Sequence, residues 1–233
     1  MSFRPRIAVL VFPGSNDDRD ACWALGALGA DAQAVWHAEP ELPRDTAAVV
    51  LPGGFSYGDY LRCGAIARTA AVMEPMRRFA AEGGPVLGIC NGFQILCEAG
   101  LLPGVLRRNR ELEFVCRDVA LRVERVAAPF TSRCEPGQYL TIPVKHGEGC
   151  WFADDETVAQ LEAEDRVVLR YAEDCNGSVA DIAGVCNEAG NVMGLMPHPE
   201  HAVDPLLGTA DGALILASLV DAARERTFAA ASV

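Results

Sequence analysis

Short, continuous apolar runs constrain the fold of this chain more than any other feature of its sequence. Residues 6–12 (RIAVLVF) form the first run, and similar runs predict strands at 32–36, 47–51 and 85–89. A strand that is covered on both faces has no polar alternate positions, which is the usual state of strands in parallel sheets. The runs therefore predict the buried strands of a mainly parallel sheet.

Helical patterns separate these runs. After the first run, Asn16 is a candidate N-cap, and Asp17 and Asp18 fall in the first helical turn, where carboxylates favour the helix dipole. We assign these two aspartates to the helix end rather than to catalysis. The apolar face of this helix is expected to contain three residues, Cys22, Leu25 and Leu28.

A second helical region covers residues 64–82, as one or two helices broken near Pro75. Short apolar strands that alternate with helices predict βαβ units with right-handed crossovers. In such a sheet, the active loops lie at the carboxyl ends of the strands.

The pattern changes in the second half of the chain, where residues 119–124 alternate between apolar and polar side chains, as in a half-exposed antiparallel strand. Further strands are expected at 139–144, 167–171, 182–187 and 192–196, with a short helix at 158–162 and a long one at 209–226. No linker or repeat interrupts the chain. We predict one α/β domain over residues 6–227, with a mainly parallel central sheet flanked by helices and an additional antiparallel portion.

The composition disfavours several classes of partner. Half of the 233 residues are hydrophobic, which is enough for a packed core without metal or disulfide staples. The formal charge of -12 argues against nucleic acid and anionic membranes, because both require clustered Lys and Arg. A small molecule or another protein is therefore the expected partner.

The nine cysteines favour a reduced compartment. They are odd in number and contain no closely spaced pair of the kind found in zinc sites, so neither a disulfide framework nor a metal site is expected. No apolar stretch approaches the ~20 residues that span a bilayer, and residues 1–5 have no signal-peptide pattern. We therefore expect a cytoplasmic protein that does not bind a membrane.

Residues 88–92 (GICNG) place Cys90 between two glycines, after an apolar run and before an amphipathic segment. This pattern is typical of a nucleophile elbow, in which a sharp strand-to-helix turn exposes the middle side chain and glycines prevent crowding. The helix N-terminus that follows favours the thiolate. Because free cysteine is also common in cores, a matching base is needed to assign Cys90 to catalysis.

His198 is the best candidate for that base among the four histidines. Pro199 disfavours the α conformation at His198, so we expect an extended path that puts His198 and Glu200 on the same side. A glutamate that accepts from one imidazole nitrogen leaves the other nitrogen to take a thiol proton. Cys90, His198 and Glu200 therefore form a candidate triad, whereas His-Pro-Glu without the elbow would indicate a rigid surface turn.

The other histidines are weaker candidates. His201 lies beyond the Pro-His-Pro unit and has the opposite phase of alternation. His37 ends an early strand without a partner pattern, which favours a structural role. His146 stands in the segment KHGEG at 145–149, which suits either a pocket lining or a plain turn.

Two backbone N–H groups are candidate donors to an oxyanion. One belongs to Asn91, directly after the nucleophile, and the other could come from Gly53-Gly54, where glycines let the main chain approach a substrate. A phosphate-binding loop at 53–58 is disfavoured, because that segment has no lysine and is followed by Asp59.

Three motifs together resemble the class I, or triad, glutamine amidotransferases: FSYGDYLRCGA at 55–65, CNGFQIL at 90–96 and PHPE at 197–200. Within that class they are similar to the glutaminase subunits of phosphoribosylformylglycinamidine synthases, which act in purine biosynthesis. Most other class I members have a different residue at the position of Asn91. The similarity runs from about residue 6 to residue 219, and it implies the flavodoxin-like fold of these amidotransferases.

The resemblance implies a reaction and a set of site residues. Cys90 would attack the carboxamide of glutamine to form a γ-glutamyl thioester, and His198 would protonate the departing ammonia and then activate water. The backbone N–H groups of Gly54 and Asn91 would hold the oxyanion. Contacts with glutamine are implied for five residues, Gly53, Phe55, Gln94, His146 and Gly147.

The resemblance also implies a complex. The ammonia would pass to a large synthetase subunit that converts formylglycinamide ribonucleotide to formylglycinamidine ribonucleotide with ATP, usually together with a small third subunit. ATP and Mg²⁺ are expected only in the synthetase, and no cofactor is expected in this chain. His201 and Lys145 depart from the common family pattern of Arg and Ala, which affects partner contacts or local charge rather than the reaction.

Three alternatives stay open on the sequence. A glutaminase subunit of another synthase would have the same triad. A redox-sensing or chaperone-like protein with a similar elbow cysteine would not require His198 or Glu200. A binding protein that has lost catalysis is disfavoured by the intact triad residues.

Overall fold

Strand β1 (Arg6–Val11) lies in the parallel half of a nine-stranded sheet, between β2 (Asp31–Trp36) and β3 (Thr46–Leu51). The computed structural model describes residues 3–127 and 129–231. The central residues of β1 are completely buried, which explains why its sequence is a continuous apolar run. β2 is one of the two edge strands of this sheet and is correspondingly less buried.

The sheet has the strand order β2-β1-β3-β4-β11-β10-β9-β6-β7. The first five strands pair in parallel, and the others pair antiparallel. The remaining strands are β4 (Val86–Ile89), β6 (Val115–Val123), β7 (Tyr139–His146), β9 (Val167–Tyr171), β10 (Ile182–Cys186) and β11 (Val192–Leu195). The predicted fold class is confirmed. A small antiparallel sheet of two strands was not predicted, and it pairs β5 (Val105–Arg107) with β8 (Cys150–Phe152).

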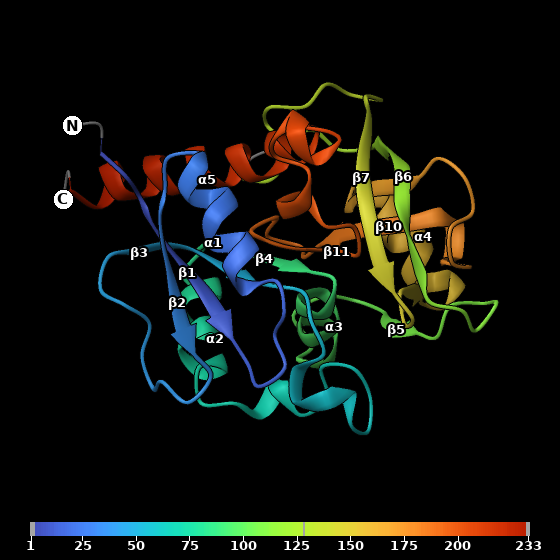
Figure 1. Cartoon of the computed structure of the whole chain (residues 1–233), viewed down its shortest axis with the longest axis horizontal. Helices are drawn as coiled ribbons and strands as arrows, with labels where there is room; N and C mark the ends of the chain where they lie inside the picture. Colours follow the sequence, from blue (N-terminus) through green and yellow to red (C-terminus); the bar gives the residue numbers. More distant parts are fainter. Residues whose placement is uncertain (1–2, 128, 232–233) are drawn as a thin grey trace.

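The described residues form five α-helices: α1 (Asp18–Ala27), α2 (Met73–Ala81), α3 (Asn91–Glu98), α4 (Asp155–Ala163) and α5 (Gly212–Ala231). Helices α1 and α5 contact each other above the parallel strands in Figure 1, and α2 and α3 lie below them. Short 3₁₀ turns are η1 (Ser56–Asp59), η2 (Ala67–Thr69), η3 (Val179–Asp181), η4 (Pro199–His201) and η5 (Pro205–Leu207). No helix in the described part of the chain is both long enough and apolar enough to cross a membrane.

The start of α1 differs from the prediction. The helix begins at Asp18, so Asp17 rather than Asn16 occupies the N-cap position. The residues buried from this helix are Ala21, Ala24 and Leu25, whereas Cys22 and Leu28 are only partly buried. Small alanine side chains allow α1 to pack closely against both the sheet and α5, and this contact sets the buried face of the helix.

Pro75 does not break a helix. It lies in the first turn of α2, where a missing N–H removes no intrahelical hydrogen bond. The break falls earlier, between η2 and the start of α2 at Met73. α5 is longer at its C-terminal end than the predicted 209–226, and the predicted domain span of 6–227 stays a prediction.

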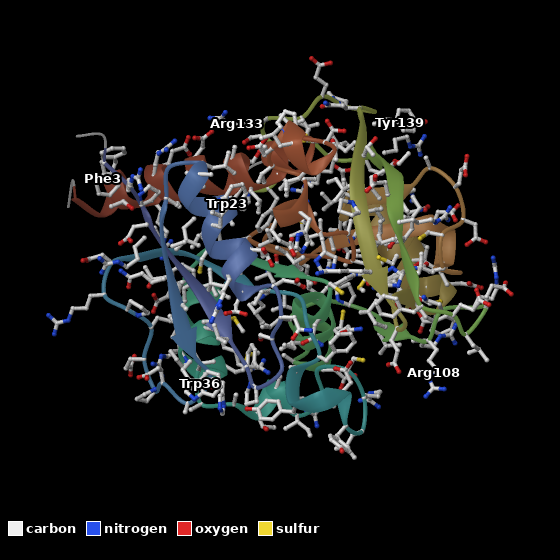
Figure 2. All side chains as sticks on the ribbon, in the orientation of Figure 1. Phe3, Trp23, Trp36, Arg108, Arg133 and Tyr139 are labelled. Atoms are coloured by element: carbon white, nitrogen blue, oxygen red, sulfur yellow. The ribbon has the colours of Figure 1, made fainter. Side chains whose placement is uncertain are left out.

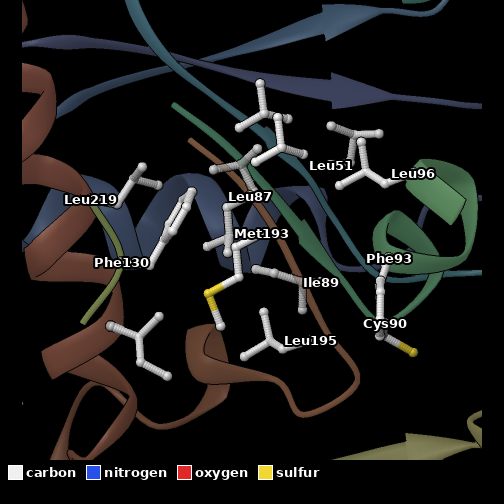
Figure 3. Packing of buried hydrophobic residues seen from close by; sticks show 14 of the residues in the cluster. Leu51, Leu87, Ile89, Cys90, Phe93, Leu96, Phe130, Met193, Leu195 and Leu219 are labelled. Carbon is white, nitrogen blue, oxygen red and sulfur yellow. The ribbon is translucent and has the colours of Figure 1, made fainter. Parts of the chain in front are cut away.

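The order of strands brings the predicted active loops together. β3, β4 and β11 are adjacent and parallel, so their carboxyl ends meet at one edge of the sheet. Gly53 and Gly54 follow β3, Cys90 follows β4, and His198 follows β11. Behind this edge the core is mainly aliphatic, with Leu87 and Met193 packed in it beside Phe93 and Phe130 (Figure 3).

Several large aromatic side chains project from the outer surface. Trp23 on α1, Trp36 at the end of β2 and Tyr139 at the start of β7 are all exposed (Figure 2). The exposed aromatic residues are spread over different elements, so these three do not form one patch.

Candidate active site

Cys90 has a strained backbone at the junction of β4 and α3. Its φ and ψ are 49° and -103°, and such sparsely populated conformations cost a non-glycine residue about 1–3 kcal/mol. Figure 3 shows its sulfur pointing away from the aliphatic side chains of β4 and β11. This is the geometry of a nucleophile elbow.

The glycines that flank the elbow have no room for a side chain. A Cβ atom on Gly88 would lie 2.6 Å from Cδ1 of Leu96 and 2.7 Å from the carbonyl carbon of Gly92. A Cβ atom on Gly92 would lie 2.0 Å from the carbonyl oxygen of Leu51. The GICNG sequence is therefore required by the close packing of α3 against β3 and β4.

Asn91 joins the elbow to the loop after β3. Its Oδ1 accepts from the N–H of Ser56 at 3.1 Å, and its Nδ2 donates to Oε1 of Gln94 at 2.8 Å. The side chain thus needs both an acceptor and a donor, which only an amide supplies here. The backbone N–H of Asn91 lies in the first turn of α3, where helices have no intrahelical acceptor.

His198 and Glu200 are in contact, as the sequence predicts. Nδ1 of His198 lies 2.6 Å from Oε1 of Glu200, and each residue is 1% exposed. His198 itself lies outside the α region, with a φ of -106° and a ψ of 85°, as predicted from the proline that follows it. The extended path does not continue to Glu200, however, because Pro199 begins the 3₁₀ turn η4. The tight turn brings the two side chains together. Nε2 of His198 is buried and has no hydrogen-bond partner among the described residues.

The surroundings of His198 favour its protonated form. Burial acts to lower the pKa of His198, but the Glu200 carboxylate and a negatively charged Cys90 outweigh it and raise the pKa to about 10. An imidazolium with Nδ1 held by a carboxylate has a proton on Nε2 that it can transfer.

A cavity of about 330 Å³ opens at this edge of the sheet. Seven of the predicted site residues line it: Gly54, Phe55, Cys90, Gln94, His146, Gly147 and His198. The other three, Gly53, Asn91 and Glu200, are not part of its lining. Each of these three residues contacts a residue that does line the cavity: Glu200 and Gly53 contact His198, and Asn91 binds Gln94.

The loop after β3 has a conformation that requires glycine. Gly54 has a φ of 144°, and a Cβ atom there would lie 2.6 Å from the backbone nitrogen of Asn16. The N–H of Phe55 donates to the carbonyl oxygen of Gly14 at 2.8 Å, which ties this loop to the end of β1. No described residue accepts a hydrogen bond from the N–H of Gly54, so this group is available to a bound molecule.

His146 faces the cavity, which settles the alternative that the sequence left open. Its Nδ1 lies 3.1 Å from Oδ1 of Asn109, and no described residue binds its buried Nε2. Burial and the positive charge of His198 lower the pKa of His146 to about 4, so its imidazole is neutral near pH 7. Gln94 supports the same loop, because its Nε2 donates to the carbonyl oxygen of Glu148 at 2.7 Å.

Asp17 is a site residue that the sequence analysis assigned to the helix end. It is 3% exposed, and its carboxylate contacts Lys145 and His201. Burial alone would raise the pKa of Asp17. The hydrogen bond with His201 and the positive charges of His198 and Lys145 outweigh burial and hold this pKa well below its usual range. His201, which the alternation argument placed on the opposite side, therefore lies beside the candidate triad.

The ligand atoms of Asp17, His198, Glu200 and His201 lie within 4.8 Å of one another, a spacing that a metal ion could use. The Lys145 ammonium group already binds Asp17, and a second cation there would be repelled. The arrangement suits proton transfer better than metal binding.

His37 has the structural role that the sequence favours. Its Nδ1 lies 2.7 Å from the hydroxyl oxygen of Tyr57, and its carbonyl oxygen accepts from the N–H of Val72. Tyr57 has a positive φ of 54°, so this contact helps to hold a strained turn between Phe55 and Asp59, which both line the cavity.

Besides Asn16, Asp17 and Lys145, four cavity residues were not predicted to belong to the site: Asp59, Cys63, Phe114 and Glu148. Asp59, Cys63 and Glu148 belong to the conspicuous segments at 55–65 and 145–149, but nothing in the sequence was a reason to assign a role to these three residues. Glu148 accepts from the thiol of Cys63 at 3.2 Å and pairs with Arg108 at 3.6 Å. Figure 2 shows Arg108 at the molecular surface.

Comparison with known proteins gives the family. The model of the CobB/CobQ-like glutamine amidotransferase domain matches residues 4–210. A protein of Rubrobacter xylanophilus named phosphoribosylformylglycinamidine synthase subunit PurQ is 61% identical over 219 residues, covering 94% of this chain and 99% of that protein. A PurQ subunit of Rhodopseudomonas palustris is 57% identical and covers 91% and 95%.

Solved structures agree with this assignment. A chain in the structure of PurLQS from Thermotoga maritima is 45% identical, with a TM-score of 0.87 over 94% of this chain and 99% of that one. A glutamine amidotransferase from Thermotoga maritima shares only the fold, at 17% identity, with a TM-score of 0.58 over 97% and 99% of the two chains. This chain therefore belongs to the CobB/CobQ-like glutamine amidotransferase family and, within it, to the PurQ subunits of phosphoribosylformylglycinamidine synthase.

Proposed function

We propose that this chain is the glutaminase subunit of a phosphoribosylformylglycinamidine synthase. It hydrolyses glutamine to glutamate and ammonia, and it delivers the ammonia to a synthetase subunit that uses ATP to form formylglycinamidine ribonucleotide. The observation that carries the chemistry is the unpartnered Nε2 of His198, which lines a cavity together with Cys90 while Glu200 holds Nδ1.

The reaction has two steps. The Cys90 thiolate adds to the γ-carboxamide carbon, and the C–N bond then breaks as the Nε2 proton of His198 passes to the leaving ammonia. The product is a γ-glutamyl thioester on Cys90. His198, now neutral, takes a proton from water, whose oxygen attacks the thioester carbon. The C–S bond breaks, glutamate leaves, and the thiolate and the imidazolium are restored.

The oxyanion of each tetrahedral intermediate is held by backbone N–H groups of Gly54 and Asn91. The free N–H of Gly54 and the helix N-terminus at Asn91 supply donors that cost no reorganisation during the reaction. Phe55, His146 and Gly147 line the cavity and contact glutamine, while Gly53 and Gln94 fix the two loops that form its walls.

The partners follow from the family. The chain docks on a large synthetase subunit and a small third subunit, in an assembly of the kind that the PurLQS structure represents. This chain needs no cofactor of its own, and ATP and Mg²⁺ bind to the synthetase. It acts in the cytoplasm, without nucleic acid or membrane as a partner.

The test measures glutamine hydrolysis by the complex with the synthetase, for the wild type, for Cys90→Ala and for Cys116→Ala. Cys116 is exposed on β6 and serves as the matched control. Cys90→Ala should lower glutaminase activity about 10³-fold or more, while synthesis from added ammonium chloride should continue. Glutaminase activity retained in Cys90→Ala would refute the mechanism.

The substrate of the complex is tested separately. Purified chain is mixed with the formylglycinamidine-forming synthetase and, in parallel, with the synthetase of another glutamine-dependent pathway. Stimulation of formylglycinamidine ribonucleotide formation supports the assignment, whereas stimulation of only the other synthetase would make this chain the glutaminase of that pathway.

A further inference from the structure

Lys145 is the only lysine in the sequence, and it lies beside the cavity. It belongs to β7, and its Nζ atom lies 2.5 Å from Oδ1 of Asp17, a residue 128 positions away in the sequence. All other basic side chains apart from the histidines are arginines. The one compact ammonium group of the chain is thus paired with a buried carboxylate next to the candidate triad.

Asp17 also approaches two histidines. Its Oδ1 lies 3.3 Å from Nε2 of His201, and its Oδ2 lies 3.7 Å from Nδ1 of His198. The residues reach this point from the N-terminus of α1, from β7 and from η4. Lys145 and His201, which come from two different elements, therefore both contact the same carboxylate.

We propose that Asp17 is a second carboxylate acting on His198, and that Lys145 offsets its charge so that the imidazole keeps a protonation equilibrium suited to both steps of the reaction. Asp17 and Lys145 are positioning residues in this scheme. The inference rests on the proposed function for its catalytic consequence.

The distances indicate that Asp17 acts on His198 through its charge. The Nδ1 proton is already donated to Glu200 at 2.6 Å, and the 3.7 Å separation from Asp17 is too long for a second hydrogen bond. At this distance, in a buried environment, the electrostatic interaction between a carboxylate and an imidazolium is strong. Neutralising the Asp17 charge with one cation, Lys145, is therefore enough to change the protonation equilibrium of His198.

The backbone of Gly53 is what allows the two groups to approach. A Cβ atom at Gly53 would lie 2.4 Å from Oδ2 of Asp17 and 2.6 Å from Cε1 of His198. The carbonyl oxygen of Gly53 also accepts from the N–H groups of Asn16 and Asp17, at 3.2 and 3.3 Å. Gly53 therefore fixes the start of α1 against the imidazole, which gives this residue a role other than direct contact with substrate.

Burial makes the pairing of Asp17 necessary. The Asp17 side chain is only 4% exposed, and an unpaired carboxylate at such a site is strongly destabilising. Lys145 is partly exposed, so its stem reaches from the cavity wall to the buried carboxylate. The titratable side chains that face His198 are those of Glu200, Cys90, Asp17, His201 and His146. Lys145 acts on His198 through its contact with Asp17.

The proposal predicts opposite effects for the two partners. Asp17→Asn removes a negative charge near His198 and should lower the pKa of its imidazole by on the order of one unit. Lys145→Met leaves that negative charge uncompensated and should raise the pKa of His198. The double variant Asp17→Asn/Lys145→Met should return close to the wild-type value, and Lys145→Arg should preserve it.

The experiment is an NMR titration of the histidine side chains in the full chain, with the His198 signal assigned by its absence in His198→Gln. Asp20→Asn is the matched control, because Asp20 lies in the same helical turn but is exposed. In the complex with the synthetase, the basic limb of the kcat/KM profile for glutamine should move in the same direction as the pKa of His198 in each variant.

Opposite shifts in the two single variants, cancelled in the double variant, support the proposal. Shifts in the same direction, or no shift in either, overturn it, even if both variants lose activity. These outcomes are separate from the proposed function: if the wild-type complex does not hydrolyse glutamine while the NMR shifts occur, the assigned reaction fails and the electrostatic coupling stands.

Discussion

Nδ1 of His198 lies 2.6 Å from Oε1 of Glu200, and the side chains of both residues are buried. The contact forms within a 3₁₀ turn, so two positions of sequence separation are enough to bring the groups together. Because the carboxylate binds Nδ1, the imidazole presents Nε2 to the cavity that Cys90 also lines. The orientation of the proposed acid-base group is thus determined by its immediate neighbours in the sequence.

Glu200→Gln should reduce the kcat/KM for glutamine by about 10²–10⁴-fold, the scale seen when the carboxylate that orients a catalytic histidine is neutralised. The amide can still accept a hydrogen bond, but it no longer stabilises the imidazolium, so the pKa of His198 falls. The measurement is glutaminase activity of the complex as a function of pH.

Glu74→Gln, on the exposed side of α2, is the control for that variant. Its activity should equal that of the wild type. A Glu200→Gln enzyme that keeps activity within about tenfold of the wild type, with an unchanged melting temperature, would contradict the assigned role of the carboxylate.

Gly92→Ala should destabilise the chain by more than about 3 kcal/mol, because its Cβ atom would overlap the carbonyl oxygen of Leu51 and neither backbone can move freely. Gly26→Ala is the matched control in α1. A Cβ atom there meets nothing within 4 Å, and replacing a helical glycine should stabilise by about 0.5–1 kcal/mol. Urea denaturation measures both, and equal free energies of unfolding would contradict the packing argument.

Asn91→Asp should be more damaging than loss of one hydrogen bond suggests. The carboxylate can accept from the N–H of Ser56, but it repels Oε1 of Gln94, which now receives a hydrogen bond from Nδ2 of Asn91. We expect a loss of about 1–3 kcal/mol in the free energy of unfolding, together with reduced kcat. Asn91→Ala should lose less stability, because it has no such repulsion, and a fully active Asn91→Asp enzyme with wild-type stability would show that the site does not depend on the hydrogen bond from Asn91 to Gln94.

The stability of the chain should fall as the pH falls from 6.5 towards 4, in part because of His146. Its pKa is about 4 when folded and near 6.5 when unfolded, so the unfolded state binds the additional proton in this window. The loss is on the order of 3 kcal/mol at most. The free energy of unfolding of His146→Gln should depend less steeply on pH between 7 and 4.5, and parallel curves for the two proteins would exclude this origin.

Much of the fold could be predicted from local patterns. The buried strands β1, β3 and β4 are continuous apolar runs, because both of their faces are covered. Strands β5 and β8 of the small sheet were missed, since each has only three residues and no distinct periodicity. The helix start near Asp17 was misplaced by one residue, which is within the usual uncertainty where a cap lacks a side-chain hydrogen bond.

The candidate site, too, has features that local sequence predicts and features that depend on distant parts of the chain. The sequence by itself determined the elbow at Cys90, the two glycines that flank it and the His198–Glu200 pair, because each depends on turn geometry within a few residues. It also determined the family, because the motifs around these residues are specific.

The sequence proposed that Cys90 and His198 act together, but only the tertiary structure showed why they meet and which other distant residues join them. The parallel insertion of β11 beside β4 places His198 at the same edge as Cys90, and the path of β7 brings Lys145 to Asp17. Such contacts depend on the order of the strands in the sheet and on which strand ends are adjacent. The local hydrophobic pattern of the sequence specifies neither of these. A buried carboxylate and its neutralising lysine can therefore be recognised as a pair only when the chain is folded.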